Sequence, residues 1–168
     1  MTVRTFDLQA SDVSWMRQLN NAVVPHIPAI EAGALDRVRK AAALAIGVEV
    51  EGVPAGFVLG MDPGADHDSS NYKWFQARFD GFLYIDRVVV DSRYRGKGLG
   101  RRLYEEAEAR AAANAVPLTC EVNEVPPNPG SLSFHEAVGF RPIGIQTVDG
   151  GCRSVVMLLK PTERRAQG

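Results

Sequence analysis

The sequence predicts an α/β chain in which one mixed sheet carries helices on its faces. The main observation is that the apolar residues change their spacing from strand-like to helical several times along the chain. The second is length: 168 residues, 45% of them apolar, suffice for one core. The chain shows no internal repeat and no low-complexity linker. We therefore expect a single domain over residues 1–168.

The N-terminal half is predicted to hold a strand, two helices and a hairpin. Ser11 and Asp12 are candidate caps of the first helix, whose apolar residues follow helical spacing. The predicted elements are, in order, a strand Val3–Phe6, a helix from Val13 to about Asn20, a helix Ile30–Ala43, and strands Ala45–Glu51 and Ala55–Met61, with Gly52-Val53-Pro54 as the turn of the hairpin.

The segment Asp62–Asp80 is predicted as a long loop, polar in its first part and aromatic in its second. Long loops in small domains often have a function, so one interpretation is a lid over a substrate. The other is an irregular segment whose aromatic side chains pack into the core. The sequence leaves both open.

The C-terminal half alternates strands and helices. The predicted elements are strand Phe82–Val90, a helix opening near Leu99 and ending near Asn114, strand Pro117–Asn123, a short helix Asn128–Val138 and a final hairpin of Arg141–Val148 and Cys152–Leu159 turned by Asp149-Gly150-Gly151.

Composition and charge restrict the partners. The formal net charge is -1, so no overall field attracts nucleic acid or an anionic membrane, and we expect neither as a partner. The N-terminus has no signal-like apolar run. Cys120 and Cys152 are interpreted as two buried thiols in a reducing compartment, which predicts a cytoplasmic protein. Neither lies at metal-ligand spacing, so no metal is expected.

The strongest chemical signal is a glycine-rich, basic run after the strand Phe82–Val90. Three glycines, Gly96, Gly98 and Gly100, fall within five residues, and five of the ten residues of Arg93–Arg102 are basic. Glycines at a helix start allow close backbone approach, and the free N–H groups there favour a phosphate. The run matches neither the dinucleotide motif G-x-G-x-x-G nor the Walker A motif. It does contain R-x-x-G-x-G, at Arg95, Gly98 and Gly100.

These residues resemble the GNAT acetyltransferase superfamily, whose signature is [QR]-x-x-G-x-[GA] between a strand and a helix. A second motif of that family, roughly N-x-x-A-x-x-F-Y-E-x-x-G-F, is similar to Asn128–Phe140, with Ser131 at the small residue and His135 at the tyrosine. The resemblance implies a mostly antiparallel sheet of six to seven strands with about four helices, the fourth and fifth strands splayed. It also implies acetyl-CoA as co-substrate.

The resemblance implies which residues hold acetyl-CoA. Backbone groups of Val88 and Val90, on either side of Val89, would bond the pantetheine arm between the splayed strands, and Asn128 would contact that arm from the next helix. The residues expected at the pyrophosphate, together with the signature Arg95, are Gly96, Lys97, Gly98, Leu99, Gly100 and Arg101.

Three side chains are candidates for catalysis. An amine must lose a proton and the departing thiolate must gain one. Glu121 resembles a fifth-strand glutamate that serves as base in some family members, and Asp86 is a second candidate. Their alternatives are a solvent-facing charge and an ion pair with Arg87. His135 is a candidate general acid, or a hydrogen-bond partner of the thiolate, because the pKa of histidine is suited to neutral pH. Its alternative is a histidine that packs against the coenzyme or caps the helix.

The acceptor is expected to be a small-molecule primary amine, attacking directly, and the chain is compatible with a homodimer. The family's acceptor side corresponds to Asn20–Ile30 and Asp62–Asp80. Candidate groups there are acids that would attract a cation, with two aromatic residues beside it. These residues are Glu31, Asp66, Asp68, Asp80, Trp74 and Phe75.

Three alternatives remain at this level. The first is a non-catalytic acyl-CoA-binding module with a degenerate site, which the histidine at position 135 could indicate. The second is a transferase for longer acyl chains, its pocket shaped by Asp62–Asp80. The third is a nucleotide-binding P-loop protein, which the missing Walker motif argues against.

Overall fold

The computed structural model describes residues 1–23, 27–125 and 127–162. The strands are β1 (Val3–Asp7), β2 (Leu44–Val50), β3 (Val53–Met61), β4 (Leu83–Val90), β5 (Leu118–Val125), β6 (Arg141–Val148) and β7 (Arg153–Lys160). The α-helices are α1 (Val13–Asn21), α2 (Ala32–Ala41), α3 (Ser70–Gln76), α4 (Leu99–Ala113) and α5 (Pro129–Ala137).

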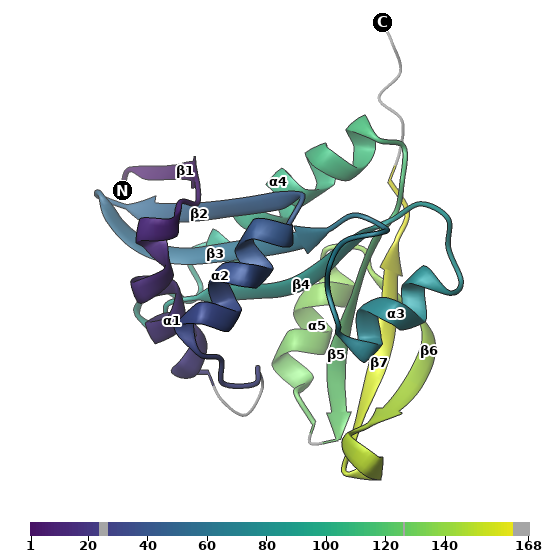
Figure 1. The fold of residues 1–168 in the computed structure, drawn as a ribbon. Helices are drawn as coiled ribbons and strands as arrows, with labels where there is room; N and C mark the ends of the chain where they lie inside the picture. The colour runs from purple at the N-terminus through teal and green to yellow at the C-terminus, as the bar shows by residue number, and fades with distance from the viewer. Residues whose placement is uncertain (24–26, 126, 163–168) are drawn as a thin grey trace, which may run out of the picture. The chain divides into compact units, whose positions relative to one another are not determined.

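The strands form one seven-stranded sheet in the order β1-β2-β3-β4-β5-β7-β6 (Figure 1). β4 and β5 pair in parallel, Leu83 with Leu118 and Tyr84 with Thr119. The pairs β1–β2, β2–β3, β5–β7 and β6–β7 are antiparallel. This confirms the predicted mixed, mostly antiparallel sheet. The described residues hold five α-helices instead of about four, because α3 forms inside the segment predicted as a loop.

The chain divides into two compact units, and β4 and α4 contribute to both. The first unit contains Met1–Met61 and Ile85–Ala107, and the second contains Asp62–Tyr84 and the chain from Glu108 onward. The glycine-rich loop belongs to the first unit, and both Glu121 and His135 belong to the second.

The first unit has a core between helices α1 and α2 and the sheet. Met16 of α1 and Leu35 of α2 are fully buried, and they join Phe57 and Leu59 of β3 and Val89 of β4 in one cluster. Helical spacing of the apolar residues in α1 places them on this single face. The last strand residues before the glycine-rich loop are therefore anchored in a packed core.

The turn between β2 and β3 is one residue tighter than predicted. Val50 pairs with Val53, so the turn residues are Glu51 and Gly52, while Val53 and Pro54 already belong to β3. Both turn residues have positive φ, 49° and 78°. Two-residue hairpins favour this left-handed backbone because it matches the twist of the strands.

The second unit has an aromatic core that helix α3 helps to build, which corrects the loop prediction for Asp62–Asp80. The hydroxyl of Ser69 caps the helix by accepting a hydrogen bond from the Tyr72 N–H. Tyr72 and Phe75 are buried, with ring centroids 5.5 and 5.8 Å from that of Tyr84. Of the two interpretations, aromatic residues packing into the core is the one realised at α3. Among the described residues, no helix is long and apolar enough to cross a membrane.

Candidate functional site

The glycine-rich loop joins the end of β4 to the start of α4 in the first unit. The chain leaves β4 at Val90 and passes through a short 3-10 turn before α4 begins at Leu99. Gly96 and Gly98 have φ values of 75° and 79°, a left-handed backbone that side chains with a Cβ disfavour. A Cβ built on either glycine would meet nothing within 4 Å. The glycines are thus required by backbone conformation, and open space lies over them.

Asp91 organises the first turn of this loop. Its carboxylate accepts hydrogen bonds from the backbone N–H and the guanidinium of Arg93, the latter at 2.8 Å. These hydrogen bonds hold the pKa of Asp91 below its usual value. The Asp91 N–H donates to the carbonyl of Ala55 on β3, 2.8 Å away. Of the five basic residues near the loop, Arg93 therefore has a structural role.

The other basic side chains predicted at the pyrophosphate are exposed. These are Arg95, Lys97 and Arg101. In the described part of the chain, no ion pair with a carboxylate holds any of the three. A helix start with free N–H groups, open space above two glycines and three exposed cations is chemistry that suits a diphosphate. The residues present therefore fit the phosphates of coenzyme A.

The strand before the loop alternates in burial. Val89 is 2% exposed and belongs to the core, whereas Val88 and Val90 are half-buried. Alternate residues of a strand face opposite sides of the sheet. The core contact of Val89 thus fixes the strand beside the two residues predicted to bond the pantetheine arm.

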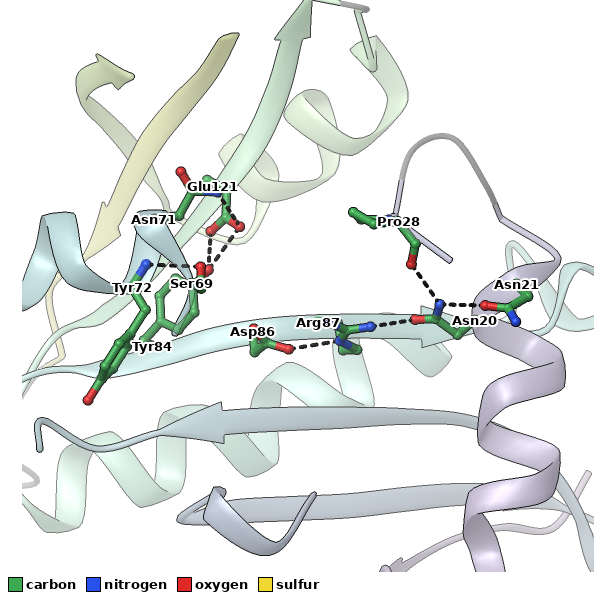
Figure 2. Close-up of polar contacts among 10 residues, drawn as sticks. All are labelled: Asn20, Asn21, Pro28, Ser69, Asn71, Tyr72, Tyr84, Asp86, Arg87 and Glu121. Carbon is green, nitrogen blue, oxygen red and sulfur yellow. Dashed lines mark hydrogen bonds and ion pairs between the residues drawn. The ribbon is translucent and has the colours of Figure 1, made fainter. Parts of the chain in front are cut away.

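Glu121 lies at the centre of a polar cluster in the second unit (Figure 2). The Tyr84 hydroxyl lies 2.7 Å from one carboxylate oxygen of Glu121 and 2.9 Å from the other. The side-chain amide of Asn71, on α3, donates to the same carboxylate at 3.1 Å. Because Tyr84 pairs with Thr119 and Glu121 is two residues further along β5, all three share one face of the sheet. The predicted base is thus a half-buried carboxylate fixed from β4 and α3.

Asp86, the other candidate base, forms the ion pair that was its alternative interpretation (Figure 2). Its carboxylate lies 2.8 Å from Nε of Arg87, and the side chains are only 5% and 12% exposed. Arg87 also donates to the side-chain oxygen of Asn20, 2.9 Å away, and the Asn20 amide donates to the carbonyl of Pro28. Asp86 therefore belongs to a network that reaches Asn20 of α1 and, through it, Pro28.

His135 lies in the last turn of α5 and is 9% exposed. Its Nδ1 is 2.7 Å from the carbonyl oxygen of Ser131. A carbonyl can only accept, so Nδ1 carries the hydrogen and Nε2 of the neutral ring is an acceptor. Burial lowers the pKa of His135 below its usual 6.5, and the hydrogen bond to Ser131 opposes this shift. The ring can therefore donate a proton from Nε2 only as the imidazolium, which burial disfavours.

Asn128 caps the start of α5. Its side-chain oxygen accepts a hydrogen bond from the Ser131 N–H at 3.4 Å, and Pro129 occupies the first helical turn. Helix formation alone is therefore enough to explain why an asparagine followed by a proline occurs here. The predicted contact of Asn128 with the coenzyme stays a prediction.

The acceptor-side candidates have other roles in several cases. Phe75 is fully buried in the aromatic core, so the prediction that it flanks a cation is wrong. Trp74 lies against β6, where a Cβ on Gly144 would come within 2.8 Å of its ring. Asp68 pairs with Lys73, and Glu31 pairs with Arg17. For Asp66 and Asp80 the acceptor-side role stays a prediction. The predicted segment Asn20–Ile30 includes residues 24–26, which lie outside the described residues.

The sequence prediction missed the two donors to Glu121, and it missed Asn20, which accepts a hydrogen bond from Arg87. Tyr84 precedes Asp86 by two positions in the predicted strand and thus shares its face, but this spacing does not indicate its contact with Glu121. Asn71 and Asn20 carried no signal, since their contacts depend on the tertiary packing of α3 and α1. Cys120 is buried as predicted, but Cys152 is exposed, which corrects the expectation of two buried thiols. Within the described residues, no group of three or more His, Cys, Asp and Glu side chains could hold a metal ion.

Comparisons with known proteins identify the family. The model described as the acetyltransferase (GNAT) family matches residues 12–140. No curated protein sequence matches the chain. Solved structures share the fold over nearly the whole chain.

Three of these structures show the extent of the likeness. The ribosomal-protein-S18-alanine N-acetyltransferase from Escherichia coli is 15% identical, with a TM-score of 0.74, 99% of this chain and 98% of that chain covered. Naa20 of Chaetomium thermophilum, in complex with a bisubstrate analogue, is 21% identical with a TM-score of 0.74, covering 100% and 94%. The putative acetyltransferase yncA of Salmonella typhimurium, with its cofactor acetyl-CoA, is 16% identical with a TM-score of 0.72, covering 100% and 98%.

At these identities the structures establish the fold, whereas the family model spans more than half of the sequence and includes both the glycine-rich loop and the Asn128–Phe140 motif. The chain belongs to the GNAT acetyltransferase family.

Proposed function

We propose that this protein transfers the acetyl group of acetyl-CoA to a primary amine of a small molecule, by direct attack of the amine. Family membership supports acetyl-CoA as the co-substrate. The observation that carries the proposal is the loop between β4 and α4, where Gly96 and Gly98 adopt a left-handed backbone with open space above them. Such a loop at a helix start presents N–H groups to a diphosphate.

Backbone and side-chain groups of the loop would bind acetyl-CoA together. Backbone N–H groups of Gly96–Arg101 would hold the pyrophosphate, and the exposed Arg95, Lys97 and Arg101 would add charge-assisted hydrogen bonds. Val88 and Val90 would bond the pantetheine arm through their backbone. When bound, acetyl-CoA would supply the thioester carbon that the amine attacks.

Glu121 is the residue we assign as general base. The ammonium form of the acceptor has no lone pair, so a proton must leave before or during attack. Glu121 would accept it, directly or through water. Asp86 is the weaker candidate because the adjacent Arg87 already balances its charge at 2.8 Å. Glu121 accepts hydrogen bonds from two neutral donors, the Tyr84 hydroxyl and the Asn71 amide.

His135 is proposed to protonate the departing sulfur only on the acid side of neutrality. Because its pKa is lowered from 6.5, the imidazolium fraction falls as pH rises through a value below 6.5, and at pH 8 the ring is neutral. We expect His135→Phe to match the wild type within a factor of about three at pH 8, and to fall progressively behind it below pH 6.5. The ratio of the two kcat values across pH 5.5–8.5 measures this. A loss of kcat in His135→Phe at pH 8 as large as its loss at pH 6 would contradict this role.

A panel of acceptors tests the proposed reaction directly. We expect release of free thiol from acetyl-CoA with at least one small primary amine, at a rate well above hydrolysis without acceptor. The panel includes polyamines, amino acids, aminoglycosides and short peptides with free N-termini. Activity on peptides alone would replace the small-molecule acceptor by a protein one. Saturable coenzyme binding with no turnover of any amine would favour the non-catalytic alternative, and propionyl- or succinyl-CoA in place of acetyl-CoA tests acyl-chain length.

A further inference from the structure

The amide of Asn71 connects the carboxylate of Glu121, on β5, to β6, the edge strand of the sheet. Its nitrogen donates to Glu121 at 3.1 Å, and its oxygen accepts a hydrogen bond from the side-chain amide of Gln146, on β6, at 2.9 Å. Asn71 is 6% exposed, so water does not easily replace either partner. Four elements, β4, β5, α3 and β6, thus meet in one hydrogen-bonded chain.

Only one orientation of the Asn71 amide satisfies both neighbours. If the amide were flipped, its oxygen would face the Glu121 carboxylate, which can only accept when ionised, and its NH₂ group would face the NH₂ group of Gln146. Both contacts would be repulsive in a partly buried place. With its NH₂ group toward Asn71, Gln146 favours the orientation in which Asn71 donates to Glu121.

The helix that carries Asn71 is itself fixed. Its residues Tyr72 and Phe75 are buried. Trp74 lies so close to β6 that a Cβ on Gly144 would clash with its ring. The helix position therefore cannot relax without disturbing the aromatic core. A donor on such a rigid element holds its acceptor in one geometry, as a preorganised site requires.

We propose that Asn71 is a positioning residue for the catalytic base, with Gln146 setting the direction of its amide. This inference rests on the proposed role of Glu121. Hydrogen bonds donated to a carboxylate stabilise its charged form, and two donors from different elements also fix its rotamer. Two of these donors are the Tyr84 hydroxyl and the Asn71 amide. The titratable side chains near them include Tyr72 and His67, whose ring centroids are 5.4 Å apart.

The first experiment measures the titration of the Glu121 carboxylate and needs no amine acceptor. In protein labelled with ¹³C at the glutamate carboxyl carbon, the Glu121 resonance is identified by its loss in Glu121→Gln. We expect Asn71→Leu to move the titration midpoint of that resonance about one pH unit upward, because a donor to the charged form is lost. Asn114→Leu makes the same change at an exposed position after α4 and is expected to leave the midpoint unchanged. An unchanged midpoint in Asn71→Leu overturns the inference.

A second variant tests the inference in case Asn71→Leu does not fold. Gln146→Leu leaves Asn71 in place but frees its amide to turn, and we expect a smaller upward movement of the same midpoint. Thermal unfolding shows which variants remain native. If Asn71→Leu does not fold, an unchanged midpoint in Gln146→Leu overturns the inference instead.

The rate of the proposed reaction separates positioning from general stabilisation. We expect Asn71→Leu to lower kcat at least about tenfold in the wild-type background and not at all in the Glu121→Gln background, where no carboxylate remains to be positioned. KM for acetyl-CoA should stay unchanged. Equal losses in both backgrounds would show a merely structural role. Full activity of Glu121→Gln would instead refute the proposed base, an outcome distinct from an unmoved resonance.

Discussion

Replacing Glu121 by glutamine is expected to lower kcat/KM for the amine by about 10²–10⁴-fold, the usual contribution of a general base. Glutamine keeps the shape of the side chain, and its oxygen, placed at Oε1, can still accept from both Tyr84 and Asn71, but it cannot take a proton. Binding of acetyl-CoA, measured by calorimetry, should not change, because the loss concerns proton transfer alone.

The matched control for this variant lies on the same strand. Glu124 is an exposed residue of β5 that accepts a hydrogen bond from the Ser154 hydroxyl at 3.2 Å. Glu124→Gln removes the same charge and should leave kcat/KM within a factor of about two. If both variants lose activity equally, or if Glu121→Gln keeps the wild-type rate, Glu121 is not the base.

Replacing Gly98 by alanine is expected to weaken binding of coenzyme A by at least about tenfold. Alanine in the left-handed region costs about 1–2 kcal/mol, which the loop can relieve by turning its N–H groups away from the phosphate position. A methyl group there meets no protein atom within 4 Å, so it would project into the open space above the loop. Both effects weaken binding of the coenzyme and leave the packing of the core unchanged.

A second glycine with the same conformation controls for the cost to stability. Gly52, in the β2–β3 turn, has a φ of 78°, close to the 79° of Gly98, and its Cβ would also meet nothing within 4 Å. We expect Gly52→Ala to lower the melting temperature about as much as Gly98→Ala and to bind coenzyme A normally. Equal affinities in the two variants would argue against a phosphate-binding role of the loop.

Much of the fold was predictable because local spacing determines it. The glycines at 96, 98 and 100 and the apolar residues Leu99 and Leu103 indicate a loop and a helix whatever the rest of the chain does. Helix α3 was not predicted, because its seven residues include Tyr72, Trp74 and Phe75, and aromatic residues are weak helix formers. Its cap Ser69 was the available signal, but the helix is stabilised mainly by burial of its aromatic side chains.

The site was predictable in its residue types more than in its contacts. Glu121 was found from its strand and the family resemblance, whereas its donor Asn71 lies fifty positions earlier in the chain and meets it only through tertiary packing. The ion pair of Asp86 with Arg87 was foreseen because the two are adjacent in sequence. The direction of the His135 proton required the helical backbone, since its partner is the carbonyl of Ser131 four residues earlier.

Titration of the purified protein with coenzyme A and, in parallel, with pantetheine tests the central claim that the loop at Gly96–Arg101 holds the diphosphate. Pantetheine has the same thiol arm and lacks the phosphates and the adenosine. We expect saturable binding of coenzyme A and binding of pantetheine at least about a hundredfold weaker, because several charge-assisted hydrogen bonds are lost. Absence of saturable binding of coenzyme A, or equal affinity for both compounds, would contradict the claim.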